Sequence, residues 1–508
     1  MNDEEKKYCR ILEISRKARV LSGISSLLEW DQETYMPSGA GEIRAEQLEL
    51  VAGLIHKEKT GRTFRTALSK LIHIDSGKIF AKSLSFQQKA ALREWRRDFI
   101  QASKLPSKFV KEFAALSAQS MQAWERAKKD DAFSHFAPFL DRFVGMCRKK
   151  AEYLGYDEHP YDALLDLYEP DMKASKVSKL FNKLKKPIMD LFCQIKSAKE
   201  NDKHFLHGKF SHAKQIAFGK DLLRSMRYSL KTGRLDLSTH PFSTSCHPTD
   251  NRITTRIHST SLMSNILAIL HEGGHALYEM GLPKEHYGSP LCEAISFGIH
   301  ESQSRWWETL IGQSRSFWKF FFPDLKKTFK GNLENIHLEQ FYRGINHVEP
   351  SLIRLEADEV SYTIHIIIRF ELELSLMEGS LSVCDIPEAW NEKMLEYLGI
   401  QANNDAEGCL QDIHWSMGAF GYFPSYALGN LYSAQFFTRF EKIYPDWQQK
   451  VERGDLSFIQ KWLYENIHRH GRVYSAKDLL KKITGGQLSA KPYISYLQSK
   501  YGEIYSLK

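Results

Sequence analysis

The stretch Leu262–Gly281 holds the residues best suited to chemistry, because the order H-E-G-G-H occupies His271–His275. In a helix, histidines four residues apart lie on the same face, so both imidazoles can bind one metal ion. Glu272 lies about 100° further round such a helix, close enough to hold a metal-bound water and act as a general base. The many apolar residues of this stretch predict a largely buried helix.

The two glycines of this motif, Gly273 and Gly274, are unusual inside a helix. Each costs about 1 kcal/mol relative to alanine in a helix interior. A helix that only packs has no reason to contain them, so we interpret the pair as the place where a substrate backbone approaches closely. Two histidines on a core helix can also be plain packing residues, so the motif needs further support.

A catalytic zinc site of this kind requires a third protein ligand and an open fourth position. The pattern after the motif predicts a second helix over Leu291–Gly312, which contains Glu293, Glu301 and Glu308. Spacing alone leaves all three open and favours Glu301 only weakly. The polar residues on either side of Glu301 suggest inward-facing groups that support a metal site.

Two later stretches carry polar residues that a substrate could contact. A long helix is predicted over Ser351–Leu376, and Arg354 on its polar stripe is suited to hold a carboxylate by two parallel hydrogen bonds. The glycine-rich and aromatic stretch Gly408–Asn430 contains Tyr422 and Tyr426. Either hydroxyl could stabilise an oxyanion formed beside a metal. The other members of the polar stripe are Asp358, Tyr362, His365 and Arg369.

Helices must position these groups, because most of the chain has apolar residues three to four apart. A helix from Glu4 to about Leu54 is interrupted near Met36–Gly39. Its part Leu27–Pro37 fits equally a partly buried helix end and a polar patch that faces a cleft. The carboxylates of Tyr161–Met172 could face a cleft, but the pattern favours a solvated face. Gly233–Ile257 is instead rich in serine, threonine and proline, and this pattern predicts a small β-ribbon. Such a ribbon would bring His240, Asp250 and Arg252 near the cleft.

Composition excludes several classes of protein. The 508 residues are 42% hydrophobic and 26% charged, as in ordinary globular proteins, and the formal charge of +8 is modest. Positive and negative residues alternate without a long basic run, which argues against a nucleic-acid partner. The seven cysteines are dispersed and predict free thiols in a reducing compartment. We see no signal peptide and no membrane span, so we expect a cytoplasmic protein.

Taken together, the motifs resemble the carboxypeptidase Taq family of zinc metallocarboxypeptidases along nearly the whole chain. One departure is Asp171, where glycine is expected after the sequence YEP, and this puts a local turn in doubt. The resemblance rests on HPF (His240–Phe242), DNRIT (Asp250–Thr254), HEGGH (His271–His275), HESQ (His300–Gln303), IRLEAD (Ile353–Asp358) and GCLQDIHW (Gly408–Trp415).

The resemblance implies a mainly α fold with a deep central groove and a small β-ribbon beside the metal helix. We expect one catalytic domain over 1–508, with a helical lobe over about 1–200 and a metal-site lobe over about 201–508. Members of the family are typically homodimers, and their substrates are peptides with a free C-terminus. We expect neither a nucleic-acid nor a membrane partner.

The resemblance also implies roles for individual residues. The metal would be zinc, with cobalt possible, and Glu272 would be the general base. Arg354 would hold the C-terminal carboxylate of the substrate, while Arg252 and His240 would help to bind it. Tyr422 and Tyr426 both remain possible oxyanion stabilisers. The implied metal ligands are His271, His275 and Glu301.

Two other functions compete with a carboxypeptidase. An oligopeptidase or endopeptidase could use the same metal site, since H-E-x-x-H does not distinguish cleavage at the end of a peptide from cleavage within it. Arg354 favours cleavage at the C-terminal end of a peptide. A scaffold protein that keeps an old fold without activity is the other alternative, and the presence of the base and of all three ligands argues against it.

Overall fold

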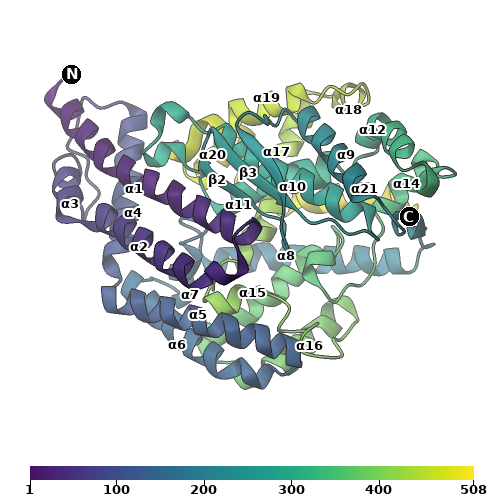
Figure 1. Ribbon diagram of the computed structural model, residues 1–508, viewed down its shortest axis with the longest axis horizontal. Helices are drawn as coiled ribbons and strands as arrows, with labels where there is room; N and C mark the ends of the chain where they lie inside the picture. The colour runs from purple at the N-terminus through teal and green to yellow at the C-terminus, as the bar shows by residue number, and fades with distance from the viewer. Residues whose placement is uncertain (508) are drawn as a thin grey trace.

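Helices form most of the structure, which is a computed structural model that describes residues 1–507 (Figure 1). This confirms the mainly α fold expected from the spacing of apolar residues. The helices that precede the sheet are α1 (Asp3–Thr34), α2 (Gly41–Thr60), α3 (Arg62–Ser69), α4 (Phe86–Lys104), α5 (Ser107–Asp130), α6 (Ala137–Leu154), α7 (Pro160–Leu165), α8 (Ala174–Lys196) and α9 (His212–Ser225).

The N-terminal helices α1 and α2 form an antiparallel pair, and the predicted break lies between them. Asn2 begins α1 with a capping box, in which its side chain accepts from the backbone of Glu5 and the Glu5 side chain accepts in return. Tyr35 ends α1, and Pro37 directs the chain into the turn before α2. Trp30, close to this turn, is buried against the sheet.

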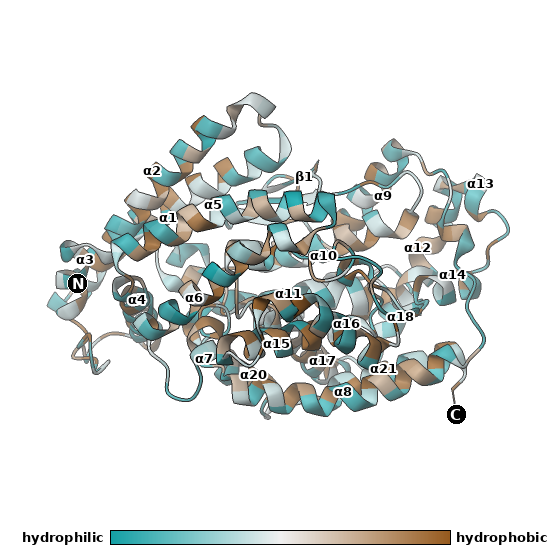
Figure 2. Cartoon of the chain, turned by 90° about the horizontal axis from the view of Figure 1, so that it is seen from below, coloured by the Kyte–Doolittle hydropathy of each residue, from teal (hydrophilic) through white to brown (hydrophobic). Residues whose placement is uncertain are grey.

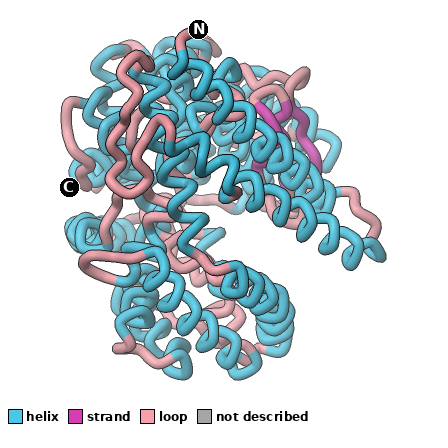
Figure 3. The backbone as a smooth tube through the Cα atoms, turned by 90° about the vertical axis from the view of Figure 1, so that its left-hand side faces the viewer, coloured by secondary structure: helices cyan, strands magenta, loops and turns pink. Residues whose placement is uncertain are grey.

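The sheet is small and has three strands, β1 (Gly233–Leu237), β2 (Ser243–His247) and β3 (Asp250–Thr255), in the order β1-β3-β2. β3 is the central strand, with β1 parallel to it and β2 antiparallel to it. This confirms the β-element expected over Gly233–Ile257. The sheet contacts α1 and also α10 (Leu262–Met280), the helix that contains the metal motif and follows the sheet in the chain. Figure 3 shows the strands beside the helices.

The second half of the chain supplies the central helices. Figure 2 shows that hydrophobic residues concentrate on these helices, around α11 and α15, and become sparse toward the periphery. They are α11 (Phe297–Arg305), the π-helix η6 (Trp306–Ile311), α12 (Arg315–Thr328), α13 (Lys330–Leu333), α14 (Leu338–Ile345), α15 (Tyr362–Glu378), α16 (Ile386–Leu398), α17 (Pro424–Ile443), α18 (Trp447–Val451), α19 (Ser457–Asn466), α20 (Ala476–Thr484) and α21 (Lys491–Tyr505).

Two hydrophobic cores hold most of the buried side chains. One core consists mainly of residues between Tyr8 and Phe99, with contributions from Leu291 and Val473. The other, far larger, runs from Ala127 to Tyr505 and includes α10 and α11. Both lobes expected from the sequence therefore contribute to the large core, and the lobe boundary near residue 200 stays a prediction.

Two predicted helices begin later than the sequence pattern suggested. The helix expected over 291–312 begins only at Phe297, because Ser296 caps it by accepting from the backbone N–H of Ile299. The helix expected over 351–376 begins at Tyr362. Asp358 accepts hydrogen bonds from the backbone N–H groups of the two residues at 360 and 361, and this turn competes with helix formation before it.

The turn at Asp171 is present although aspartate replaces the expected glycine. Its φ of 65° lies in the left-handed region that favours glycine. The Asp171 N–H donates to the Asp166 carboxylate at 2.8 Å, and the Asp171 carboxylate accepts from Arg97 at 3.1 Å. These local hydrogen bonds explain how aspartate is accommodated in that conformation.

None of the helices over residues 1–507 has an apolar stretch long enough to cross a bilayer.

Candidate metal centre

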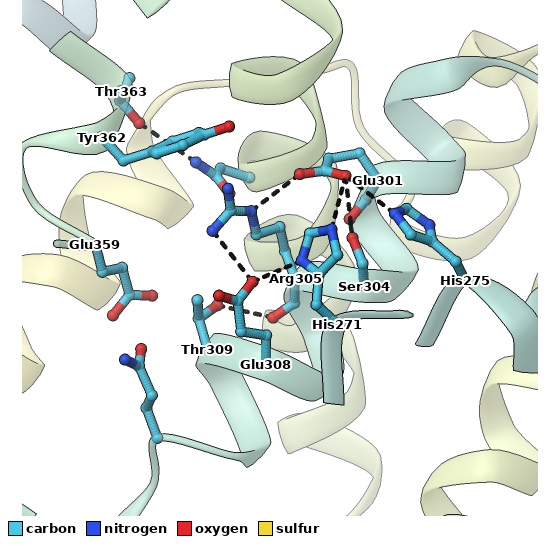
Figure 4. Close-up of polar contacts among 12 residues, drawn as sticks. His271, His275, Glu301, Ser304, Arg305, Glu308, Thr309, Glu359, Tyr362 and Thr363 are labelled. Atoms are coloured by element: carbon cyan, nitrogen blue, oxygen red, sulfur yellow. Dashed lines mark hydrogen bonds and ion pairs between the residues drawn. The ribbon is translucent and has the colours of Figure 1, made fainter. Parts of the chain in front are cut away.

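Three side chains from two helices converge on one point. His271 and His275 come from α10, Glu301 comes from α11, and one ligand atom from each lies within 4.8 Å of the other two. Glu301 Oε2 lies 3.7 Å from His271 Nε2 and 3.4 Å from His275 Nε2. Figure 4 shows this carboxylate with a contact to each of the two imidazole rings. The motif helix therefore has the geometry expected from the sequence.

The other nitrogen of each imidazole is already engaged. His271 Nδ1 lies 2.8 Å from Glu308 Oε2, and His275 Nδ1 lies 3.2 Å from the backbone oxygen of His300. When each Nδ1 donates to its oxygen, both Nε2 atoms are left as free electron-pair donors toward Glu301. In this neutral form, the two imidazoles and the carboxylate make a donor set that fits a divalent metal ion.

The three glutamates that the sequence left open have different roles. Glu301 faces both histidines, whereas Glu308 contacts the far nitrogen of His271 and so orients a candidate ligand. Glu293 lies in the connection before α11 and accepts from Arg472 at 3.2 Å. The spatial arrangement thus separates one candidate ligand from its neighbours, which spacing could not do.

The junction between α11 and the π-helix η6 places two charged side chains at the centre. Arg305 ends α11, and its Nε donates to Glu301 Oε1 at 3.0 Å. Glu308 lies in the first turn of η6, where it accepts from Arg305 Nη1 at 3.2 Å. Single π-turns inserted after α-helices are frequent at functional sites. The Arg305 guanidinium is a feature that the sequence analysis missed.

Our interpretation of the glycine pair is wrong. A Cβ on Gly274 would lie 2.5 Å from the backbone oxygen of Gln303, and one on Gly273 would lie 3.0 Å from the side chains of Leu223 and Met226. The glycines therefore allow α11 and α9 to pack closely on α10, and protein fills the space that we assigned to a substrate. Close helix contact is what brings Glu301 to the histidines.

A third glycine makes the same kind of contact on the opposite side of α11. A Cβ on Gly429 of α17 would lie 2.5 Å from Glu301 Cγ and 2.7 Å from its Cβ. The helix that carries Glu301 is thus packed against both Gly274 and Gly429, without space for a methyl group at either glycine. Interiors packed to this density transmit any displacement directly to their neighbours.

Burial and charge shift the pKa values at the centre in different directions. Burial raises the pKa of Glu272 to about 7. Burial alone would lower the pKa of His271, but the carboxylates of Glu301 and Glu308 outweigh it and raise that pKa to about 9. For His275, burial prevails and lowers the pKa to about 3. The basic partners of Glu301 keep its pKa far below the usual value, despite its burial.

Arg354 lies in a one-turn helix, η7 (Arg354–Glu356), and its guanidinium is buried. Its Nε and Nη2 donate to Asp412 Oδ1 at 3.0 and 2.8 Å, and its Nη1 donates to the Tyr362 hydroxyl at 3.1 Å. The other oxygen of Asp412 accepts from Arg369 Nε at 2.6 Å. Two arginines thus share one carboxylate, which leaves one positive charge unbalanced within this cluster of three groups.

The neighbouring histidines add no further positive charge. Burial and the two arginines lower the pKa of His365, and burial lowers the pKa of His414 to about 3, so both are neutral. Arg354 makes three of the five hydrogen bonds that a guanidinium can donate, and each terminal nitrogen keeps one free N–H. A carboxylate ligand would satisfy both the free donors and the unbalanced charge.

Tyr422 and Tyr426 lie together but differ in their hydrogen bonds. The Tyr426 hydroxyl lies 3.1 Å from His414 Nε2, whereas the two tyrosine rings are 5.3 Å apart. Burial and the nearby charge of Glu301 raise the pKa of Tyr422 to about 12, so its hydroxyl keeps its proton. Both residues therefore lie within the electrostatic reach of the metal-site carboxylate.

Arg252 and His240 lie on the sheet side, where the structure gives them different surroundings. Arg252 of β3 binds Asp250 through two hydrogen bonds of 2.8 and 3.0 Å, and its guanidinium stacks 4.6 Å from the Trp30 ring. Arg234 stacks on the same ring at 4.8 Å. The end of α1 therefore docks onto the sheet through Trp30. His240 is exposed in the loop between β1 and β2.

The carboxylates of Tyr161–Met172 do not form the solvated face that we expected. Asp162 is 3% and Glu169 1% exposed. Asp162 accepts from the backbone of Ala174, and Glu169 accepts from the backbone N–H of Gly298 at the beginning of α11. An oxygen that accepts from one of the first backbone N–H groups of a helix satisfies a donor that has no partner within the helix. Glu169 thus anchors the ligand-bearing helix, a role that the charge pattern did not reveal.

Comparison with known proteins gives one consistent result. The family model described as carboxypeptidase Taq (M32) metallopeptidase matches residues 10–501. Thermostable carboxypeptidase 1 of Thermus thermophilus is 40% identical over 512 residues, which cover 99% of each chain. The crystal structure of an M32 carboxypeptidase from Deinococcus radiodurans superposes with a TM-score of 0.95 at 37% identity, and covers 99% of this chain and 100% of that one. A Pyrococcus furiosus carboxypeptidase superposes with a TM-score of 0.94 at 35% identity and 99% coverage of both chains.

Proposed function

The chain belongs to the carboxypeptidase Taq (M32) family of metallopeptidases, and from this membership we propose a zinc-dependent release of C-terminal amino acids from peptides. His271, His275 and Glu301 would hold the ion, and cobalt could replace zinc because nitrogen and oxygen ligands accept several divalent ions. The observation that carries the proposal is the pairing of this donor set with the unbalanced positive charge at Arg354 and Arg369.

When bound, the ion would supply Lewis acidity toward a water molecule and the scissile carbonyl. Glu272 takes the proton from the attacking water and then delivers it to the leaving amine, and its raised pKa suits both steps. Arg354 holds the C-terminal carboxylate through its two free N–H groups. Arg252 and His240 would bind more distant parts of the peptide.

An oligopeptidase or endopeptidase activity is the alternative on the same residues. We expect a peptide with a free C-terminus to be cleaved about 10- to 100-fold faster than its C-terminally amidated twin, because a charge-assisted contact contributes about 1.5–3 kcal/mol. Rates are compared by mass analysis of the products, with a chelator-treated sample as the control. Equal rates for the two peptides, with cleavage at internal bonds, would establish the alternative.

Tyr422 rather than Tyr426 is the proposed oxyanion stabiliser. Nε2 of a neutral His414 can accept a hydrogen bond from the Tyr426 hydroxyl, so that O–H group is not free to donate to an oxyanion. Tyr422→Phe is expected to lower kcat by about 10²–10³-fold with little change in KM, as for the loss of one oxyanion donor. Tyr426→Phe, the matched control, should have a much smaller effect on kcat. A larger loss in Tyr426→Phe would reverse the assignment.

We also propose that two copies of the chain associate through α1 and α2. These helices expose large apolar side chains, and patches of this kind mark contact surfaces in soluble proteins. Leu50→Glu, which replaces a side chain that is 66% exposed, should convert a dimer into a monomer in light scattering while activity per chain is kept. A wild-type monomer would contradict the proposal. The exposed residues are Val20, Ile24, Leu27, Ile43, Leu50 and Leu54.

A further inference from the structure

Tyr362, the first residue of α15, lies between two buried arginines that serve different parts of the site. Its hydroxyl accepts a hydrogen bond of 3.1 Å from Arg354 Nη1. Its ring faces the other arginine, because Arg305 Cζ lies 4.2 Å from the ring centroid. Figure 4 shows Tyr362 on the side of Arg305 and Glu301 that is away from His275. The tyrosine is itself only 6% exposed.

The arginine under the ring belongs to the metal centre. Arg305 donates to Glu301 Oε1 at 3.0 Å and to Glu308 Oε2 at 3.2 Å. Glu308 in turn holds Nδ1 of His271 at 2.8 Å. The position of one guanidinium therefore affects two of the three candidate ligands, directly for Glu301 and through Glu308 for His271.

The arginine at the hydroxyl belongs to the proposed carboxylate site. Arg354 is fixed on one edge by Asp412, which also binds Arg369. The Tyr362 hydroxyl accepts from Nη1, the terminal nitrogen that Asp412 does not contact. The free N–H groups that would bind a substrate carboxylate therefore point in a direction that Asp412 and Tyr362 together determine.

A tyrosine is well suited to this position because its two ends have different chemistry. The ring face is negative and attracts a cation, while the hydroxyl oxygen accepts from an N–H group. Phenylalanine would keep the first interaction and lose the second, whereas leucine would lose both. The two contacts can therefore be separated by substitution.

We infer that Tyr362 is a positioning residue that sets the spacing between the carboxylate-holding Arg354 and the metal ligands. This spacing decides which peptide bond of a bound substrate lies at the metal, and it selects the last bond over internal bonds. The inference rests on the proposed function, since it requires that Arg354 hold the C-terminal carboxylate. A residue that merely packs in the core would affect stability without changing the choice of bond.

The test compares Tyr362→Phe and Tyr362→Leu in the full-length, metal-loaded protein. For each variant, kcat and KM are measured with a free-acid peptide and with its amidated twin, and zinc affinity is measured by competition with a chromogenic chelator. Tyr397→Phe and Tyr397→Leu are matched controls. Tyr397 is also buried, its hydroxyl accepts from Lys185 at 2.8 Å, and that ammonium lies 4.4 Å from its ring.

Tyr362→Phe is expected to raise KM for the free-acid peptide about tenfold and to lower the preference over the amide by the same factor, because one hydrogen bond to a charged group is lost. Its zinc affinity should equal that of the wild type. Tyr362→Leu should show the same loss of preference and a zinc affinity lowered about tenfold, as for other losses around metal ligands. The Tyr397 variants should keep both properties.

The inference is overturned if Tyr362→Phe keeps the full preference for the free acid. It is also overturned if Tyr362→Leu changes zinc affinity and preference no more than Tyr397→Leu does, since both would then report only a loss of core packing. A wild-type protein that does not distinguish the free acid from the amide would instead contradict the proposed function. The two failures are therefore distinguishable.

Discussion

Replacing Glu272 with glutamine is expected to lower kcat about 10³–10⁴-fold while each chain still binds one divalent ion. Glutamine has nearly the same shape as glutamate but cannot accept a proton, and general-base catalysis contributes about 10²–10⁴-fold. Glu272 lies in the motif helix and is 7% exposed, but it is not among the three groups that converge on the metal position. Metal content should therefore be unaffected.

The measurement combines steady-state kinetics with metal analysis of the purified variant. Glu285→Gln is a suitable control, because Glu285 is exposed in the short helix after α10 and should keep full activity. Residual turnover of Glu272→Gln within tenfold of the wild type, with metal bound, would exclude this residue as the base.

The pH dependence of the wild type provides a second check on the same residue. Burial raises the pKa of Glu272 to about 7 in the metal-free protein, and a nearby dication would lower it from that value. Because the base must be deprotonated, kcat/KM should fall as the pH decreases through this pKa. The acidic limb is therefore expected at or below pH 7.

Gly429→Ala is expected to weaken metal binding by about 10- to 100-fold, although residue 429 is not a ligand. The added methyl group would lie 2.5 Å from Cγ of Glu301, so the ligand or its helix must move. Overpacking of this kind costs about 1–3 kcal/mol. Displacing the residues that hold a metal ligand in place lowers metal affinity by about one to two orders of magnitude. Activity should fall in parallel at limiting zinc.

Zinc titration against a competing chelator measures this effect, and excess zinc should restore part of the activity. Gly145→Ala is the matched control, because Gly145 is also inside a helix but a Cβ there meets nothing within 4 Å. That substitution should stabilise the protein by about 0.5–1 kcal/mol and leave zinc affinity unchanged. An unchanged affinity in Gly429→Ala would show that the helices can separate without moving Glu301.

The sequence determined the features that depend on local spacing. Histidines four residues apart on an apolar helix must share a face, so the metal motif and its position on α10 were predictable. The small sheet and the break between α1 and α2 also followed from local patterns. The family was recognisable because several short motifs occur in one order. These inferences need no knowledge of which distant segments meet.

Only the tertiary structure decided what depends on contacts between distant segments. Glu301 differs from Glu293 and Glu308 because of where α11 crosses α10, and sequence spacing does not encode that crossing. The residues just before Tyr362 form a turn instead of the expected helix, because the Asp358 carboxylate accepts from the nearby backbone N–H groups.

The glycines show most clearly that the sequence alone does not reveal contacts between distant segments. Alone, Gly273 and Gly274 suggested access for a substrate, but the structure fills that space with α9 and α11. The role of Gly429 was invisible, because it lies more than a hundred residues from the carboxylate that it contacts. A glycine reports only that a side chain is excluded, and the neighbour that excludes it is known only from the packed fold.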